Sequence, residues 1–329
     1  MNNFAPVLII TLCRFEHFRR CITSLSQCTH ADKTDLIISL DYPLRESHWE
    51  GYRKIDAYLD QIQGFNSVKV VKRQTNYGAI ENYFESRKEV LEQYDRLIFT
   101  EDDNEFSVNF LDYLNKGLNL YENDSRVYAV CGYNYPLEMP ESYSKPYYFS
   151  KTFSAWGYGI WRNRLRTEHY SAEDIALFMK DWKHAFAAYQ MAPQKILTLL
   201  MMIKRNLPLY GDGVVSLENI IKGTLCIFPA VSKVRNHGHD GSGVHCGDLN
   251  GLLYSSQTID SNACFNFQAD VPLATDREVS NTVKRFFNLD LKQRLICLAL
   301  LPIIARAALL KSVGTTANVG APGSRPRTP

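Results

Sequence analysis

The 329-residue sequence contains no Cys-x-x-Cys pair, because its eight cysteines are scattered from position 13 to position 297. That spacing fits neither a zinc ribbon nor a small disulfide scaffold. The apolar segment Phe4–Leu12 has no basic region before it and no small-residue cleavage site after it, so no signal peptide is evident. We therefore expect a reducing, cytoplasmic compartment.

Acidic residues are absent after Asp290, where six of the 37 Lys and Arg residues lie. The remaining 31 basic residues face all 35 acidic residues in positions 1–290, so the body of the protein is slightly acidic. A slightly acidic body argues against nucleic acid as the main partner. With 45% hydrophobic and 22% charged residues, the composition is that of a soluble globular protein. No internal repeat is present.

The first 135 residues alternate between short apolar runs and segments typical of helices. Continuous apolar, β-branched strands separated by helices indicate a parallel sheet covered on both faces, with right-handed crossovers. The sequence thus predicts an α/β fold. The expected strands are 5–12, 34–40, 67–73, 95–100 and 126–133, and the expected helices are 14–26, 46–62, 79–93 and 107–121.

Polar residues follow four of these strands. The carboxyl ends of parallel strands meet at one edge of a sheet, where ligands of such folds bind. A single polar strand end would mean little, but four at the same edge indicate a binding site. The four are Arg14, Asp41, Asn76 with Gly78, and the acidic triplet 101–103.

The triplet Glu101, Asp102 and Asp103 places three carboxylates side by side directly after an apolar strand. Carboxylate oxygens are the ligands of Mg²⁺ and Mn²⁺, which keep positions open for water and substrate phosphates. The alternative is a solvated acidic loop, or the cap of a helix that begins near Ser107, where negative charge is favoured. The three other polar strand ends favour a metal and ligand site.

Four segments together resemble a known family: "PVLIITLCR", "LIISLDYP", "NYGAIENY" and "RLIFTEDDNEFSVNFLDYL". They are similar to GT-A fold glycosyltransferases of the family-2-like kind, and especially to the eukaryotic N-acetylglucosaminyltransferase that initiates hybrid N-glycans. The resemblance covers residues 5–135 in motif order and 153–245 more loosely. Nucleotidyltransferases share the fold, but "TLCRFEHF" lacks the glycine loop that they carry after the first strand.

The resemblance implies a role for each donor-side residue. Asp103, the last acid of the motif, would bind a divalent cation, Mn²⁺ or Mg²⁺. Asp102 would lie near the ribose or reach the metal through water, and Glu101 near the sugar. Arg14 and Asp41 match the family's contacts to the nucleotide base. A carboxylate can accept the imide N–H of uracil, which suggests a UDP-sugar donor.

The reaction would place negative charge on the diphosphate as the sugar leaves, and a metal would stabilise that charge. If the anomeric centre inverts, a carboxylate on the opposite side accepts the proton of the acceptor hydroxyl. Asp212, in "LYGDGVV", falls where the family places this base, although the surrounding residues depart from the family's "WDDW" pattern. Glu218 is the alternative.

Two further segments bear on the substrates. The resemblance implies that "FSAWGYGIWR" forms an acceptor or sugar pocket with Trp156, Gly157 and Trp161, since aromatic faces pack against sugars; core packing is the alternative. The glycine-rich "NHGHDGSGVHC" would order over the donor. In that interpretation His245 contacts the diphosphate or completes the metal shell, whereas zinc binding or a merely flexible loop are the alternatives.

The segment Leu295–Leu310 is apolar on nearly every side, is broken by Pro302 and Arg306, and is flanked by basic residues. At sixteen residues it is short for a membrane span. Either it docks on the body, or it lies in the plane of an anionic membrane surface. We favour the second interpretation, hence a protein that is peripheral on the inner face of the cytoplasmic membrane.

The sequence therefore predicts a metal-assisted, inverting glycosyltransferase that acts on a glycan or lipid-linked acceptor in surface polysaccharide assembly. Its expected parts are a nucleotide-sugar half at 1–135, an acceptor-binding and catalytic half of the same domain at 136–290, an apolar basic helix at 291–313 and a disordered tail at 314–329. A hexosyl or N-acetylhexosaminyl group would be moved. A non-catalytic nucleotide-sugar or glycan-binding protein is the main alternative, followed by a metal-dependent nucleotidyltransferase.

Overall fold

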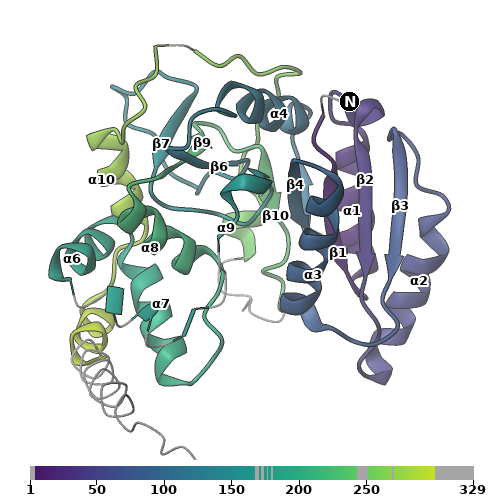
Figure 1. Cartoon of the computed structure of the whole chain (residues 1–329), viewed down its shortest axis with the longest axis horizontal. Helices are drawn as coiled ribbons and strands as arrows, with labels where there is room; N and C mark the ends of the chain where they lie inside the picture. Colours follow the sequence, from purple (N-terminus) through teal and green to yellow (C-terminus); the bar gives the residue numbers. More distant parts are fainter. Residues whose placement is uncertain are drawn as a thin grey trace, which may run out of the picture.

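The computed structural model describes residues 4–166, 170–171, 174–175, 177–178, 181–242, 251–268 and 270–300. An eight-stranded sheet with the order β3-β2-β1-β4-β8-β6-β9-β7 forms its centre, and helices lie on both sides of this sheet (Figure 1). The predicted class, α/β with a mainly parallel sheet flanked by helices, is confirmed.

The first four strands of the large sheet are parallel to one another. The five residues of β1 are Val, Leu, Ile, Ile and Thr, and four of them are buried, as expected for a strand that is covered on both faces. In contrast, β3 lies at the edge of the sheet and is largely exposed. The bounds are β1 (Val7–Thr11), β2 (Asp35–Leu40), β3 (Ser67–Lys72) and β4 (Arg96–Glu101).

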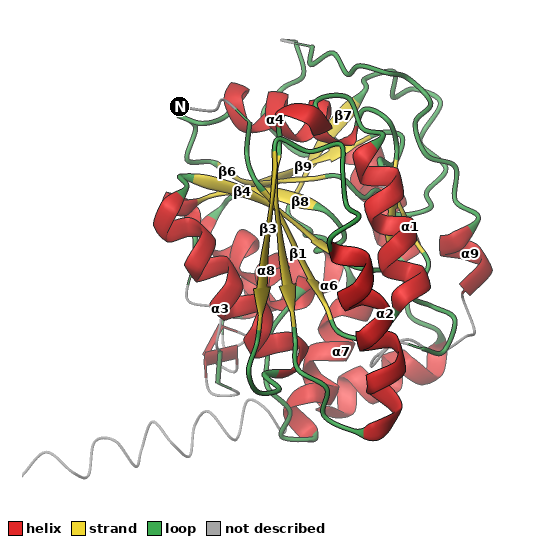
Figure 2. Ribbon diagram, turned by 90° about the vertical axis from the view of Figure 1, so that its right-hand side faces the viewer, coloured by secondary structure: helices red, strands yellow, loops and turns green. Residues whose placement is uncertain are grey.

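Helices connect these strands and cover opposite faces of the sheet. Figure 2 shows α1 and α2 on one face and α3 on the other. The apolar residues of α1 that face the sheet, Phe18, Cys21, Ile22 and Leu25, are all buried. The helices are α1 (Phe15–Ser26), α2 (Trp49–Leu59), α3 (Gly78–Gln93) and α4 (Phe110–Leu120), with short 3₁₀ turns η1 (Ala31–Lys33) and η2 (Glu46–His48).

The other half of the sheet mixes directions. The strand β8 lies antiparallel between β4 and β6, β9 is parallel to β6, and β7 is antiparallel to β9. Strands from both sides of residue 135 therefore belong to one sheet and one continuous hydrophobic core. The bounds are β6 (Val127–Cys131), β7 (Tyr147–Ser150), β8 (Tyr158–Trp161) and β9 (Leu225–Pro229), and the 3₁₀ turn η3 (Arg162–Arg164) follows β8.

A second, two-stranded sheet corrects one expectation. We expected a helix from residue 107, but residues 104–106 form β5 (Asn104–Phe106), and α4 begins only at Phe110. The partner of β5 is β10 (Val234–Asn236), which pairs antiparallel with it. The pattern of residues 101–110 gives no sign of this strand, because its partner lies 130 positions further along the chain.

The helices α6 (Trp182–Met191), α7 (Pro193–Lys204) and α8 (Asp212–Lys222) pack together around a second hydrophobic cluster. We call these three helices the helical lobe. Residues 291–300 are also helical, and Cys297 and Leu300 belong to the same cluster. In the described part of the chain, no helix is long and apolar enough to span a bilayer. The remaining helices are α9 (Gly251–Ser255) and α10 (Arg277–Phe286).

Candidate active site

Two buried carboxylates share one guanidinium at the carboxyl ends of β1 and β4. Asp102 and Asp103 are only 4% and 7% exposed. Arg14, which precedes α1, donates from Nη2 to Asp102 Oδ1, and the same nitrogen lies 2.9 Å from Asp103 Oδ2. Thr11 Oγ1 donates to Asp102 Oδ2 at 2.8 Å. Burial alone would lower the pKa of Arg14, but the two carboxylates outweigh it and raise this pKa far above its usual value.

The small sheet brings a third segment to Asp103. Asn236, at the end of β10, donates from Nδ2 to Asp103 Oδ1 at 2.8 Å, and the N–H of His237 donates to the carbonyl of Asp103 at 2.9 Å. Gly238 follows so closely that a Cβ at this position would lie 2.1 Å from Asp103 Oδ2. Only glycine fits here. The segment 236–238 therefore forms one wall of the carboxylate site.

Asp41 is bound by the protein itself. Its Oδ1 accepts the backbone N–H groups of Tyr42 and Tyr77, both at 2.8 Å, and its Oδ2 accepts that of Gly78 at 2.8 Å. Asn76 Nδ2 donates to the same Oδ2 at 3.2 Å and to the carbonyl of Tyr42 at 2.6 Å. The four acceptor positions of the carboxylate are thus filled. Asp41 fixes the loop after β3 and the start of α3, where Gly78 has a φ of +76°.

Glu101 carries a strongly shifted pKa. Burial, followed by the charge of Asp103, raises this pKa to about 8, and Asp212 and Asp102 add to the effect while Arg14 opposes it. The effect of Asp212 indicates that the start of α8 lies near the end of β4. The carboxylates therefore outnumber the positive charges at this edge of the sheet.

Asp212 is the first residue of α8 and is held from two sides. Its Oδ1 accepts the N–H of Ala155 at 3.0 Å, and its Oδ2 lies 3.3 Å from Lys195 Nζ. Lys195 comes from α7, donates also to the carbonyl of Phe153 at 3.1 Å and is mostly buried. The side chain of Asp212 is 33% exposed, so it is fixed and yet open to solvent.

Glu218 lies elsewhere, although it is only six residues further along α8. It is buried, lies 3.0 Å from Lys222 and 3.8 Å from Arg166. With 3.6 residues per turn, two side chains that are six positions apart lie about 120° from each other around the helix axis. The two carboxylates therefore point to different sides of α8. The geometry favours Asp212 over Glu218 as the residue that faces the carboxylate edge.

Trp156 belongs to an aromatic cluster beside the carboxylates. Its ring makes edge contacts with Tyr133 at 4.6 Å and with His239 and Tyr254, both at 5.4 Å between centroids. His239 follows Gly238 directly and feels the charge of Asp103, although burial lowers its pKa. The cluster therefore adjoins the carboxylate site through the segment 236–239.

The two other predicted acceptor residues, Gly157 and Trp161, do not belong to the aromatic cluster around Trp156. Trp161 pairs with Arg96 at the beginning of β4, the edge of the sheet opposite to the carboxylates. It is buried, and its indole N–H donates to the carbonyl of Leu118 at 3.1 Å. Gly157 packs over the core, where a Cβ would lie 2.9 Å from the ring of Phe110. The structure does not bring Trp161 into the cluster around Trp156.

His245 and Cys246 lie outside the described residues. Of the other histidines in this segment, His237 Nε2 lies 2.6 Å from Glu105 Oε2, and His239 contacts Trp156. Within the residues that the structure describes, no three His, Cys, Asp or Glu side chains converge as a ready metal-binding set. The segment 236–239 adjoins Asp103 through Asn236, Gly238 and His239, three residues of the glycine-rich segment for which the sequence predicted no individual role.

A divalent cation nevertheless fits the chemistry of this edge. Such ions are commonly held by one or two carboxylates together with substrate phosphates, so three protein ligands are not required. Asp102 and Asp103 offer hard oxygens, and the pKa of Glu101 is raised first by burial and then by the charge of Asp103. The residues that would hold the ion are Asp103 and Asp102.

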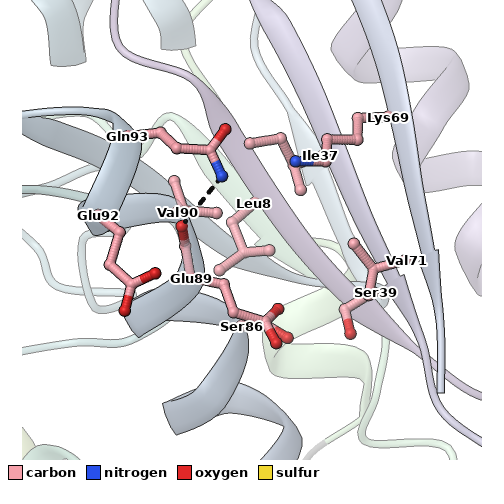
Figure 3. Close-up of a pocket in the computed structure, with 10 residues that line it drawn as sticks. All are labelled: Leu8, Ile37, Ser39, Lys69, Val71, Ser86, Glu89, Val90, Glu92 and Gln93. Carbon is pink, nitrogen blue, oxygen red and sulfur yellow. Dashed lines mark hydrogen bonds between the residues drawn. The ribbon is translucent and has the colours of Figure 1, made fainter.

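Two pockets of the described chain lie apart from the triplet 101–103. One, of about 260 Å³, lies between α3 and the sheet and is lined by residues such as Leu8, Ile37 and Val90 (Figure 3). Another, of about 400 Å³, lies beside α1 and includes Arg19 and Glu105.

No family model and no curated protein matches the chain. Two solved structures illustrate its likeness to others. TarS of S. aureus is 14% identical, with a TM-score of 0.33, over 47% of this chain. The match covers only 28% of the TarS chain. The mannosyltransferase PcManGT from Pyrobaculum calidifontis, in complex with GDP-Man and Mn²⁺, is 13% identical with a TM-score of 0.37, over 96% of this chain and 76% of that one.

Proposed function

We propose that the chain is a glycosyltransferase, which moves a sugar from a nucleotide diphosphate donor to a glycan or lipid-linked acceptor. One observation carries the proposal. A buried pair of carboxylates, Asp102 and Asp103, meets Arg14 at the carboxyl ends of parallel strands, and Asp212 and Trp156 lie at the same edge. Donor groups and an acceptor-side base can thus act on one bound sugar.

On the donor side, Asp103 and Asp102 would hold a divalent cation, Mn²⁺ or Mg²⁺. When bound, such an ion stabilises the negative charge that grows on the diphosphate as the sugar departs. Arg14 supplies a permanent positive charge at the same place. Asp41 keeps the loop at Asn76 and Gly78 in position, and these hydrogen bonds occupy the oxygens that we expected to accept the imide N–H of uracil. A UDP-sugar is therefore kept as the first donor to test, without a base contact from Asp41.

On the acceptor side, Asp212 would accept the proton of the attacking hydroxyl. Its fixed orientation supports this role, because Ala155 and Lys195 hold both oxygens while a third of the side chain stays exposed. Trp156 offers an aromatic face of the kind that packs against the C–H groups of a sugar. A base that lies across the sugar from the departing diphosphate leads to inversion.

The setting we infer is surface polysaccharide biosynthesis in the cytoplasm. All seven cysteines in the described part of the chain are free thiols, in agreement with a reducing compartment. The group that is moved would be a hexose or an N-acetylhexosamine.

Titration calorimetry of UDP into the purified protein, with and without Mn²⁺, tests the donor site. We expect binding that requires Mn²⁺ and is lost in Asp103→Ala. The control is Asp32→Asn, an exposed carboxylate in η1, which should bind as the wild type does.

Three outcomes would change the proposal. Binding of another nucleotide in place of UDP would refute the uracil inference and leave the class intact. Nucleotide binding that is the same in Asp103→Ala would remove this carboxylate from the site. Tight binding of UDP-sugars without transfer or hydrolysis, in wild type and Asp212→Asn alike, would favour a non-catalytic binding protein.

A further inference from the structure

The helix formed by residues 291–300 has two contrasting faces. On the inner face, Cys297 and Leu300 are 1% and 4% exposed and pack into the cluster of the helical lobe. Asp290 precedes the helix, and its Oδ1 accepts the N–H of Gln293 at 2.7 Å. Figure 1 shows this helix beside α6. Its position on the body is therefore already fixed by apolar contacts on one side.

The outer face consists of leucines. Leu291, Leu295 and Leu298 are 75%, 59% and 64% exposed. Their spacing of four and three residues places them on one side of an α-helix, with Leu300 on the opposite side and Cys297 turned away from them. We call these three residues the leucine face. A helix that only docked on the body would carry polar residues here.

Positive charge borders the leucine face on both sides. Lys292 and Arg294 are exposed and lie on opposite flanks of the three leucines in a helix of 3.6 residues per turn. Arg294 also donates to the carbonyl of Leu289 at 3.0 Å. No Asp or Glu follows Asp290 in the sequence, so the basic residues of this region have no acidic neighbours further along the chain.

We propose that the leucine face lies in the plane of an anionic membrane surface. Leucines that point outward between flanking cations match the interface between acyl chains and negatively charged head groups, where the long basic side chains reach back to the phosphates. A second copy of the chain fits less well, because a twofold interface would bring the basic residues Lys292 and Arg294 of both copies to the border of one contact. The residues involved belong to neither the donor site nor the acceptor site, so the inference is independent of the proposed function.

Of the apolar segment Leu295–Leu310, residues 301–310 lie outside the described residues, as does the predicted tail 314–329. In the described residues, the two interpretations of this segment are compatible. The helix docks on the body through its inner face, and its outer face remains available to lipid. Membrane contact would then hold the whole body at the surface where a lipid-linked acceptor is found.

Co-sedimentation of the full chain with lipid vesicles tests this inference. We expect wild type to sediment with vesicles of phosphatidylcholine and phosphatidylglycerol in near-physiological salt, and to remain in solution with phosphatidylcholine alone. The double variant Leu295→Ser/Leu298→Ser should bind the anionic vesicles at least about tenfold more weakly, because each buried leucine contributes strongly to partitioning. Both leucines are exposed, so the variant should fold normally, which circular dichroism checks. Leu252→Ser is the matched control, since Leu252 is 83% exposed but belongs to α9.

Equal sedimentation of wild type and the double variant would overturn the inference, and so would failure of wild type to bind anionic vesicles. A dimer in analytical ultracentrifugation that the double variant dissociates would assign the leucine face to a second copy instead. Loss of vesicle binding in Leu252→Ser to the same extent would show that exposed leucines in general, rather than this face, govern binding.

Discussion

Arg14 is the built-in counter-ion of the carboxylate pair, and its removal should change metal binding in a specific direction. The guanidinium contacts both Asp102 and Asp103, and both carboxylates are at least nine-tenths buried. A divalent cation that binds Asp103 enters a site where a positive charge is already present. Arg14 and the metal should therefore oppose each other's binding, and this coupling is reciprocal.

The magnitudes follow from burial. Removal of one partner from a buried ion pair costs about 3–5 kcal/mol, because the remaining charge is left uncompensated. In Arg14→Gln we expect a loss of stability of that order without metal. A cation at about 100 times its Kd then returns about 2.7 kcal/mol. The affinity for Mn²⁺ should rise by about tenfold or more relative to wild type, which corresponds to about 1.4 kcal/mol.

Urea unfolding with and without Mn²⁺ measures the loss of stability. Calorimetric titration of Mn²⁺ in the absence of nucleotide measures the change in affinity. Arg14→Lys is the matched control, since it keeps the charge but loses the planar fork that reaches two carboxylates, and its Mn²⁺ affinity should stay near that of wild type. An unchanged or weaker Mn²⁺ affinity in a folded Arg14→Gln would refute the reasoning. If neither protein bound Mn²⁺, either alone or together with UDP, the proposed metal site itself would be wrong.

Three further predictions concern the same site. Asp212→Asn should lower kcat by about 10²–10⁴ while UDP binding is kept, since a general base contributes a factor of that order; an equal loss of donor affinity in the titration would contradict this role. The pKa of Glu101 is raised from 4.5 to about 8, so the folded protein holds an extra proton between these values and loses stability as the pH rises through this window. In Glu101→Gln the decline should disappear from urea unfolding midpoints measured from pH 4.5 to pH 8.5, and an unchanged decline would assign it to other groups. Gly238→Ala would place a methyl group 2.1 Å from Asp103 Oδ2, so the variant should show weaker Mn²⁺-dependent UDP binding with a native circular dichroism spectrum. Normal UDP binding would show that the segment 236–238 can move away from Asp103.

The strand ends were the part of the site that the sequence could predict. Apolar runs fix where strands begin and end, and parallel strands must place their carboxyl ends at one edge. Arg14, Asp102 and Asp103 accordingly meet where expected. Their mutual contacts were less apparent, because the sequence suggested that Arg14 contacts the nucleotide base, whereas in the structure it bridges two carboxylates.

The residues of the site that lie beyond residue 135 could not be predicted from strand ends. Asn236 and Gly238 reach Asp103 only because β10 pairs with β5, and such a long-range pairing leaves no local pattern. Lys195, which holds Asp212, comes from a helix without any distinguishing motif. The sequence indicated that the segment 236–247 lies over the donor and selected His245, which lies outside the described residues, rather than Asn236 or Gly238.

The sequence by itself determined the α/β class, the order of its first strands and helices, and the acidic edge after β4, since these depend on local apolar periodicity and on side chains next to strand ends. Tertiary structure alone decided between similar residues that are close in sequence. Asp212 faces the site and Glu218 does not, because helix rotation turns them to different sides of α8. Trp156 joins the site while Trp161 does not, because β8 runs antiparallel to β4 and carries Trp161 to the opposite edge of the sheet.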